Sequence, residues 1–241
     1  MSEAVIEVQN LNAGYGGIPV VRNLNIHVNA GEVVALLGPN GAGKTTTLLT
    51  ISGILKPVSG NINVLGESTA GQRPEVIARR GMAHVAEDRS LFFDLTVQEN
   101  LRLGLTPDRT KRAAAQENAL NMFPALRPLL ERRAGLLSGG EQQMLAMARG
   151  LASEPKVLLV DEMSLGLAPI IVERMLPIVR EIADKTGAGV LMVEQHVGLA
   201  LSVADRGYVM AHGELTMEGS AKELQANRSL LEASYLGGEA H

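Results

Sequence analysis

The chain contains no cysteine, so disulfide bonds, thiolate metal ligands and thiol nucleophiles are excluded. Aromatic residues make up only 2 % of its 241 residues, and tryptophan is absent. Few side chains are therefore available on which the bases of single-stranded nucleic acid could stack. A formal net charge of −4 also lacks the basic surplus that is typical of nucleic-acid-binding proteins. We therefore expect no nucleic-acid partner.

Long apolar runs are missing as well. No stretch approaches the roughly 20 apolar residues that cross a bilayer, and the N-terminal sequence MSEAVIEVQN lacks the basic and apolar segments of a signal peptide. We expect a cytoplasmic chain that reaches a membrane only through a partner. Hydrophobic residues still make up 46 % of the chain, which is enough for one large domain or two modest lobes.

Three short runs rich in valine and leucine predict buried strands: Val33–Leu37, Val157–Val160 and Val190–Val193. Each run is too short for a buried helix and ends in polar or glycine residues, which is typical of a parallel sheet covered by helices on both faces. The ligands of such sheets bind beyond the carboxyl ends of the strands. We therefore expect one site near the residues that follow the runs, which are Gly38, Asp161 and Glu194.

The remaining sequence predicts two further kinds of structure. The N-terminal segments VIEVQNL and VVRNLNIHV alternate apolar and polar residues, which predicts antiparallel strands with one solvated face. Residues 94–152 show helical spacing, so we expect a helical lobe there, inserted between two parts of an α/β core, residues 1–93 and 153–241. A helix is expected near Ile170–Lys185, and a last helix followed by a tail is expected from Ala221 onward.

A phosphate-binding loop follows the first buried run. Eight residues fit the pattern G-x-x-x-x-G-K-[ST] between a predicted strand and a predicted helix. Glycines let successive backbone N–H groups point at an anion, and the following helix adds its positive N-terminal dipole. Lys44 supplies a cation for the β- and γ-phosphates, and the Thr45 hydroxyl can bind Mg²⁺. The predicted nucleotide-binding residues of this segment are Gly38, Pro39, Asn40, Gly41, Ala42, Gly43, Lys44, Thr45 and Thr46.

Two acidic residues end the second buried run, VLLVDE. Asp161 at the end of the strand can hold Mg²⁺ through its water shell, and Glu162 can accept a proton from an attacking water. Surface strands also end in acids, so this pattern alone is weak. Its combination with the phosphate loop favours a catalytic reading.

Residues 137–143 read LSGGEQQ and define a second anion-binding helix start. Ser138 can cap a helix that starts near Glu141, while Gly139 and Gly140 permit close backbone approach. Together with the phosphate loop and the VLLVDE run, LSGGEQQ resembles the signature of the ABC-family ATPases, and the resemblance covers essentially the whole chain. It implies an α/β P-loop NTPase (RecA-like) core with an antiparallel β subdomain and a small inserted helical subdomain.

The resemblance assigns further roles by position. Tyr15 corresponds to the aromatic residue that stacks on adenine, with an ordinary turn residue as the alternative, and His196 to the switch histidine that touches the γ-phosphate. The segment SLGLAP, residues 164–169, takes the place of the loop that crosses between two ATPase subunits. The other histidines show no metal-binding spacing, and we expect solvent-exposed or structural positions for His27, His84, His212 and His241.

Two positions depart from the family pattern. Glu87 stands where most of the family has a glutamine that joins the core to the helical lobe. A carboxylate can contact Mg²⁺ or water, but it cannot donate a hydrogen bond to phosphate. Met163 replaces the proline that usually follows the catalytic acid, which would alter loop stiffness rather than chemistry.

The resemblance also implies an assembly. In the family, the signature helix of one subunit completes the ATP site of a second ATPase subunit, so two chains pair head-to-tail around ATP. The Glu87 position and the segments SLGLAP, LTVQENL and SYLGG are similar to one branch, the LivF-type ATPases of branched-chain amino-acid importers. Members of that branch work with a second ATPase, two integral membrane permeases and an extracytoplasmic substrate-binding protein. This places the chain at the cytoplasmic face of the cell membrane.

Three alternatives remain open from the sequence. Urea or amide importers and lipid or lipopolysaccharide exporters have similar ATPase subunits. A soluble ABC protein acting on DNA or ribosomes would need a long coiled-coil insertion or a second ATPase cassette, and the interval between Lys44 and Ser138 holds no such insertion. A small-molecule kinase could use the same phosphate loop, but it would not explain LSGGEQQ.

Overall fold

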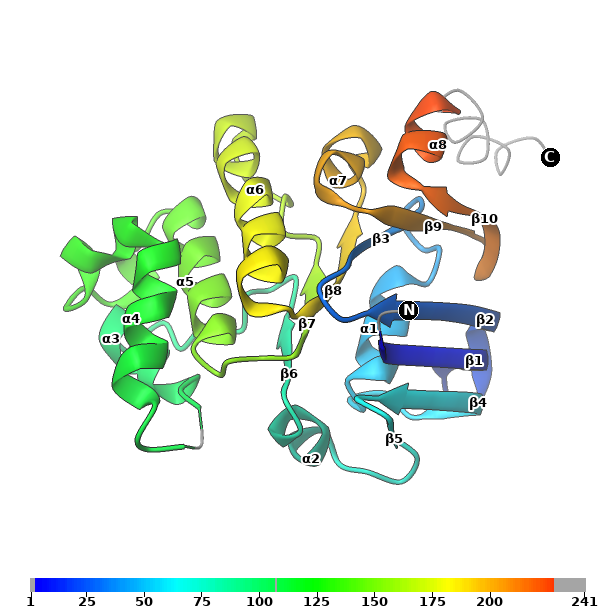
Figure 1. Cartoon of the computed structure of the whole chain (residues 1–241), viewed down its shortest axis with the longest axis horizontal. Helices are drawn as coiled ribbons and strands as arrows, with labels where there is room; N and C mark the ends of the chain where they lie inside the picture. The colour runs from blue at the N-terminus through cyan, green and yellow to red at the C-terminus, as the bar shows by residue number, and fades with distance from the viewer. Residues whose placement is uncertain (1–2, 107, 228–241) are drawn as a thin grey trace.

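The computed structural model describes residues 3–106 and 108–227, whose strands form two sheets (Figure 1). The larger sheet has the strand order β10-β9-β3-β8-β7-β6, and the smaller sheet has the order β2-β1-β4-β5. The larger sheet consists of β3 Val33–Leu37, β6 Met82–Val85, β7 Val157–Asp161, β8 Gly189–Glu194, β9 Arg206–Ala211 and β10 Glu214–Ser220. The smaller sheet consists of β1 Ala4–Tyr15, β2 Ile18–Asn29, β4 Pro57–Val64 and β5 Glu67–Ser68.

The centre of the larger sheet is parallel and buried on both faces. Strand β3 pairs in parallel with β8 and β9, and β7 pairs in parallel with β6 and β8, while β10 runs antiparallel to β9. Successive residues of β3 enter different cores: Val34 and Leu36 pack toward the smaller sheet, and Ala35 and Leu37 pack toward the opposite face. Two-sided burial explains the uninterrupted apolar runs, and it confirms the predicted parallel strands.

The smaller sheet is antiparallel, as the alternating N-terminal pattern predicts. Inward residues of β1, such as Ile6, Val8 and Leu11, are almost completely buried, while Gln9 and Asn10 face solvent. Helix α1, Lys44–Ile51, contacts β1, β2 and β4 on one side and β7 on the other. The helix that follows the phosphate loop is therefore held between the two sheets.

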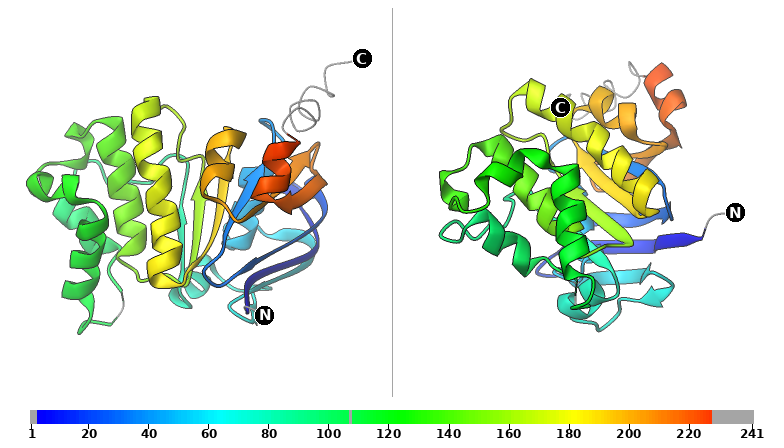
Figure 2. Two further views of the ribbon diagram at one scale, coloured as in Figure 1. Left: turned by 45° about the horizontal axis from the view of Figure 1, so that its top comes forward. Right: turned by 60° about the vertical axis from the view of Figure 1, so that its left-hand side comes forward.

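Helices cover the other face of the larger sheet (Figure 2). The helices of this layer are α5 Gly139–Leu151, α6 Pro169–Thr186, α7 Val197–Val203 and α8 Ala221–Ala226. Helix α6 contains Pro177 and confirms the helix predicted near Ile170–Lys185. Helix α8 confirms the start of the predicted C-terminal helix, whereas the expected tail with its SYLGG segment lies outside the described residues.

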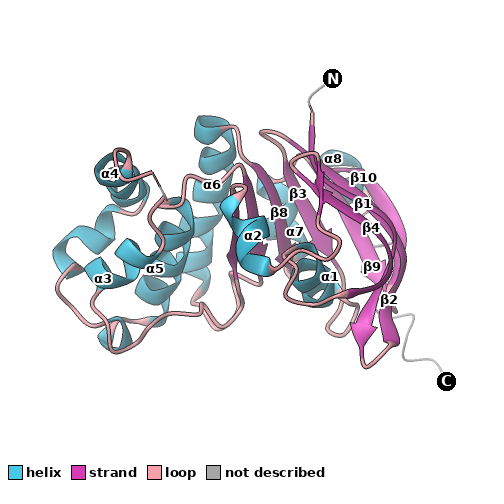
Figure 3. Cartoon of the chain, turned by 90° about the horizontal axis from the view of Figure 1, so that it is seen from below, coloured by secondary structure: helices cyan, strands magenta, loops and turns pink. Residues whose placement is uncertain are grey.

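Helices α3 and α4 gather beside α5, away from the smaller sheet (Figure 3). This part comprises α3 Val97–Leu103, α4 Arg112–Met122 and the 3₁₀ turns Pro124–Leu129 and Ala134–Leu136, while a separate short helix, α2 Pro74–Arg79, precedes β6. The helical content agrees with the lobe expected over 94–152, and the exact division of the chain stays a prediction. In the part of the chain that the structure describes, no helix has both the length and the apolar character to cross a membrane.

Candidate nucleotide-binding site

The loop between β3 and α1 wraps tightly around the side chain of its lysine. At Gly38 a Cβ atom would lie 2.3 Å from the carbonyl oxygen of Met210, and the positive φ of +99° at Gly43 disfavours any other residue. Lys44 is only 4 % exposed, and its Nζ donates hydrogen bonds to the carbonyl oxygens of Gly38 (2.9 Å) and Pro39 (3.0 Å). The loop therefore holds a buried ammonium group at the carboxyl end of β3.

Glu162 lies opposite that ammonium group. Its Oε1 is 3.6 Å from Lys44 Nζ, and its Oε2 accepts a hydrogen bond of 2.7 Å from Gln195 Nε2. The backbone of Glu162 adopts a φ of +43°, which is costly for a residue with a side chain. Its amide donates to the carbonyl of Val193 on the neighbouring strand β8, which holds this turn in place. The carboxylate is thus fixed from two strands and directed at the phosphate loop.

Asp161 and Thr45 form the neighbouring part of the site. Thr45 Oγ1 donates to Asp161 Oδ1 over 3.3 Å. Burial raises the pKa of Asp161 to about 6, and the nearby charges of Glu162 and Glu87 raise it further, while Thr45 and Lys44 oppose the shift. Adjacent hydroxyl and carboxylate oxygens in a place of excess negative charge are suited to a hard divalent cation. The residues predicted to hold Mg²⁺ therefore fit that ion.

A cluster of three or more acidic or histidine ligands is absent from the described residues. Mg²⁺ commonly keeps several waters and takes one or two protein ligands beside the phosphates of its nucleotide.

Glu194, at the end of the third buried run, has a different role from its neighbours. It is 1 % exposed and accepts hydrogen bonds from the Ser164 amide (3.1 Å) and hydroxyl (2.5 Å). Burial raises the pKa of Glu194, and these two hydrogen bonds oppose the shift. The residue lies at the expected edge of the sheet, where it anchors the loop that begins at Ser164. Met163, just before that loop, is buried in the core on the helical face.

A cavity of about 610 Å³ lies between α1, the end of β7 and the loop after β6. Thr45, Asp161 and Glu87 line it together, as the sequence predicts for residues around one Mg-nucleotide. His84 on β6 also lines it, with its Nε2 buried and without a hydrogen-bond partner among the described residues. Burial lowers the pKa of His84 to about 4, against a small opposing effect of Asp88. The sequence did not predict a place for His84 in this cavity, because His84 comes close to α1 only through the pairing of β6 with β7.

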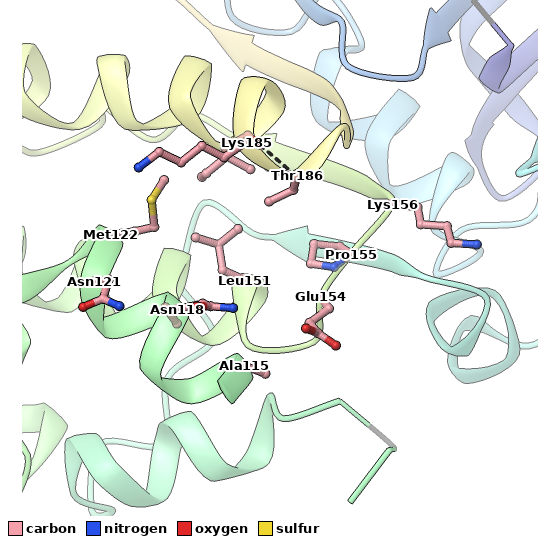
Figure 4. A pocket seen from close by; sticks show the side chains of 12 residues that line it. Ala115, Asn118, Asn121, Met122, Leu151, Glu154, Pro155, Lys156, Lys185 and Thr186 are labelled. Atoms are coloured by element: carbon pink, nitrogen blue, oxygen red, sulfur yellow. Dashed lines mark hydrogen bonds between the residues drawn. The ribbon is translucent and has the colours of Figure 1, made fainter. Parts of the chain in front are cut away.

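A second hollow, of about 560 Å³, lies at the opposite end of the sheet (Figure 4). It is bounded by α4, the end of α5 and the end of α6, and Pro155 and Lys156 before β7 contribute to its wall. None of the predicted site residues lines it. It is separate from the phosphate loop, which lies at the carboxyl end of the strands.

The other predicted residues occupy the surface. Tyr15 at the end of β1 is 55 % exposed, and His196 is exposed just before α7. Ser138 caps α5 as predicted: its Oγ accepts from the Glu141 amide and donates to the Glu141 carboxylate, which also accepts from the Ser138 amide. Helix α5 starts at Gly139, two residues before the expected start. Helices α5 and α1 pack on opposite faces of the larger sheet.

Comparisons with known proteins agree with this geometry. A family model described as ABC transporter matches residues 21–164. The chain is 40 % identical to the high-affinity branched-chain amino acid transport ATP-binding protein BraG of Pseudomonas aeruginosa, over 97 % of this chain and 100 % of the relative. It is 34 % identical to the lipopolysaccharide export system ATP-binding protein LptB of Escherichia coli, over 97 % of this chain and 98 % of the relative.

Solved structures also match this chain over nearly its full length. An ATP-binding subunit of an ABC transporter superposes with a TM-score of 0.83 at 28 % identity, covering 97 % of this chain and 98 % of that one. The fold and the glycine loop thus define a P-loop ATPase with an α/β core, which confirms the predicted fold class. The chain belongs to the ABC transporter family. Its predicted similarity to the ATPases of branched-chain amino-acid transporters is confirmed as well.

Replacing His84 by leucine should make the free energy of unfolding fall less as the pH is lowered. The pKa of His84 falls from its ordinary value of 6.5 to about 4 on folding, so the unfolded chain binds the extra proton between these values. The free energy of unfolding therefore falls as the pH drops through this window, by about 3 kcal/mol from this group. Urea denaturation at pH 7 and pH 4.5 should show a smaller drop for His84→Leu than for the unmodified chain.

The raised pKa of Asp161 acts in the opposite direction in the same window, because the folded chain then binds the extra proton. That contribution is common to both proteins, so the difference between them reports on His84. The exposed His212, replaced by asparagine, is the matched control and should retain the full pH dependence. Equal drops for His84→Leu and the unmodified chain would contradict a buried neutral histidine.

Proposed function

We propose that this chain binds ATP with Mg²⁺ and hydrolyses it, as the motor subunit of an importer of branched-chain amino acids. The observation that carries the proposal is the buried Lys44 ammonium group inside the glycine loop, 3.6 Å from the Glu162 carboxylate. A cation surrounded by a phosphate-binding backbone is suited to the β- and γ-phosphates. The Glu162 carboxylate beside this cation is suited to accept a proton from a water molecule that attacks the γ-phosphate.

Glu162 acts as the general base in this proposal. Its Oε2 is held by Gln195, and its backbone is held by Val193, so its carboxylate has little freedom to turn away. A fixed carboxylate can orient a water molecule for attack on the γ-phosphate and accept its proton. Lys44 offsets the negative charge of the phosphates during that step.

Mg²⁺ would be held by Thr45 and Asp161, with Glu87 as a further candidate ligand on the opposite wall of the cavity. The bound ion would screen the negative charge of the phosphates and of the carboxylates around it. The chain's own contribution is the pairing of Thr45 with Asp161, which brings the two oxygen ligands together before the nucleotide arrives. Asp161 is buried, and Thr45 beside it is half-buried.

A second ATPase subunit would complete the site. Ser138, Gly139 and Gly140 present a capped helix N-terminus, which is suited to an anion, yet α5 and α1 pack on opposite faces of the larger sheet. We therefore assign this terminus to the ATP of a partner chain in a head-to-tail dimer. The exposed Tyr15 is free to stack on adenine, and the exposed His196 is free to approach the γ-phosphate when the subunits close.

The proposed transport role rests on the 40 % identity to BraG, over the full length of that relative. Integral membrane permeases would hold the chain at the cytoplasmic face of the membrane, and an extracytoplasmic substrate-binding protein would act with them indirectly. The second candidate is the ATPase of a lipopolysaccharide or lipid exporter. Its support is the 34 % identity to LptB, also over nearly the full length.

Replacing Glu162 by glutamine should abolish turnover while preserving nucleotide binding. The amide keeps the size of the side chain but cannot accept the proton of the attacking water, so we expect the rate of ATP hydrolysis to fall about 100-fold or more. Phosphate release and equilibrium binding of a fluorescent ATP analogue measure the two quantities. Glu173→Gln, an exposed position on α6, is the control and should hydrolyse ATP at the normal rate. Near-normal turnover of Glu162→Gln would refute the assigned base.

Purification of the chain from its native membrane should recover its partners. We expect two permeases and a second, different ATPase to accompany it, because the proposed site is incomplete without a second cassette. Identification of the accompanying proteins by mass spectrometry is the measurement. Permeases of a lipopolysaccharide exporter would favour the second candidate function, and ribosomes or DNA in their place would contradict a transport role.

A further inference from the structure

The loop after β6 carries two consecutive residues in a strained backbone conformation. Arg89 has a φ of +63° and Ser90 a φ of +45°, although neither is glycine. Asp88 stabilises the turn, because its Oδ1 accepts hydrogen bonds from the Ser90 amide (2.9 Å) and hydroxyl (2.7 Å). The same loop presents Glu87 to the cavity that contains Thr45 and Asp161. A rigid turn therefore begins directly at the proposed Mg-nucleotide site.

Within the described residues, every hydrogen bond that Arg89 makes outside its own loop goes to helix α5. Its Nε donates to Gln143 Oε1 over 3.0 Å, and its Nη1 donates to Gln142 Oε1 over 2.9 Å. Its carbonyl oxygen accepts from Arg149 Nη2 over 3.1 Å, two turns further along the same helix. These three bonds join the strained turn to both the start and the end of α5. We call this set of contacts the Arg89 clamp.

The clamp extends to the segment before the signature. Gln142 Nε2 lies within hydrogen-bond distance of the carbonyls of Ala134 (3.3 Å) and Leu137 (3.4 Å), which precede Ser138. Gln143 is 2 % exposed, so its side chain has no room to turn away. A Cβ atom added at Gly139 would lie 3.8 Å from Arg89 Nη2. The guanidinium group thus lies against the first turn of the signature helix.

The hydrogen bonds of the clamp fix the orientation of the groups that they join, and they do not neutralise a charge. Arg89 forms no ion pair within the described residues, and both of its side-chain acceptors are neutral amides. A planar guanidinium can bond two neighbouring acceptors at fixed angles, which the rotating ammonium group of lysine cannot reproduce. Hydrogen bonds to a charged donor are also stronger than neutral ones. The contacts therefore favour a single orientation of the loop relative to α5.

We propose that Arg89 is a positioning residue that makes the Glu87 loop and the first turn of α5 move as one body. The inference rests on the proposed function: contact of Glu87 with Mg-ATP in its own subunit then sets the orientation of Ser138, Gly139 and Gly140 toward the ATP of the partner. Arg89 lines the same cavity as Thr45 and Asp161, but its guanidinium nitrogens bond Gln142 and Gln143 rather than either of these residues. Loss of the Arg89 side chain should leave nucleotide binding intact and slow ATP hydrolysis, which needs both subunits.

Arg89→Ala should therefore separate binding from turnover. In the chain purified with its partners, we expect kcat for ATP hydrolysis to fall about 10-fold, with KM and the affinity for a fluorescent ATP analogue changed less than about 2-fold. Arg89→Lys keeps the charge and one hydrogen bond, and we expect an intermediate kcat. Arg127→Ala is the matched control, because Arg127 also bridges two acceptors on the helical side, Glu117 and Asn121, and both belong to α4 rather than to α5.

A distance measurement tests the coupled movement directly. The chain has no cysteine, so Gln72→Cys and Glu131→Cys, both exposed, accept one spin label each without further changes. We expect Mg-ATP to shift the label-to-label distance as a single population in the unmodified chain and in Arg127→Ala. In Arg89→Ala we expect a broad distribution that Mg-ATP no longer shifts.

The same shift in Arg89→Ala as in the unmodified chain would overturn the inference, as would the absence of a shift in an unmodified chain that binds Mg-ATP. A chain that does not bind Mg-ATP at all would contradict the proposed function itself. Loss of ATP binding by Arg89→Ala would also contradict a positioning role, as would an unchanged kcat in that variant.

Discussion

The central constraint of this structure is the burial of the Lys44 ammonium group at the carboxyl end of the parallel sheet. An ammonium group removed from water is costly unless charges and dipoles surround it. Here the carbonyls of Gly38 and Pro39 and the carboxylate of Glu162 provide them. The loop can wrap this closely because Gly38 has no side chain that would collide with the carbonyl oxygen of Met210 on β9.

The surrounding carboxylates make this place electrostatically unbalanced. Asp161, Glu162 and Glu87 lie around Lys44, and burial together with the charges of Glu162 and Glu87 raises the pKa of Asp161 to about 6. A divalent cation arriving with a nucleotide would relieve that repulsion. If the chain binds Mg-ATP as proposed, relief of this repulsion would contribute to the free energy of binding.

Local sequence determined much of this arrangement. The runs around Val33, Val157 and Val190 predicted strands because two-sided burial demands unbroken apolar residues. The glycine pattern predicted the loop at Lys44, and the spacing of Ser138 and Glu141 matches the capping box that starts α5. These features depend on neighbours within a few residues. The roles of Tyr15 and His196 came from family resemblance and stay predictions.

Features that depend on packing between distant segments could not be predicted from the sequence. Glu194 looked like a third site residue, but its side chain holds Ser164, thirty residues earlier in the chain. The place of His84 beside α1 depends on the pairing of β6 with β7, and the Arg89 clamp depends on how α5 packs against the loop after β6. No periodicity or short motif encodes these contacts, because each side chain is placed by the tertiary fold.

The most direct test of this account is the affinity of the chain for Mg-ATP when Lys44 is replaced by alanine, measured by isothermal titration calorimetry. Loss of the one cation inside the glycine loop should weaken binding by 100-fold or more, on the order of 3 kcal/mol. We expect the Lys44→Ala chain to stay folded although the carbonyls of Gly38 and Pro39 lose their donor, and circular dichroism can verify this. Unchanged affinity in a folded Lys44→Ala chain would contradict the assignment of this loop as the phosphate site.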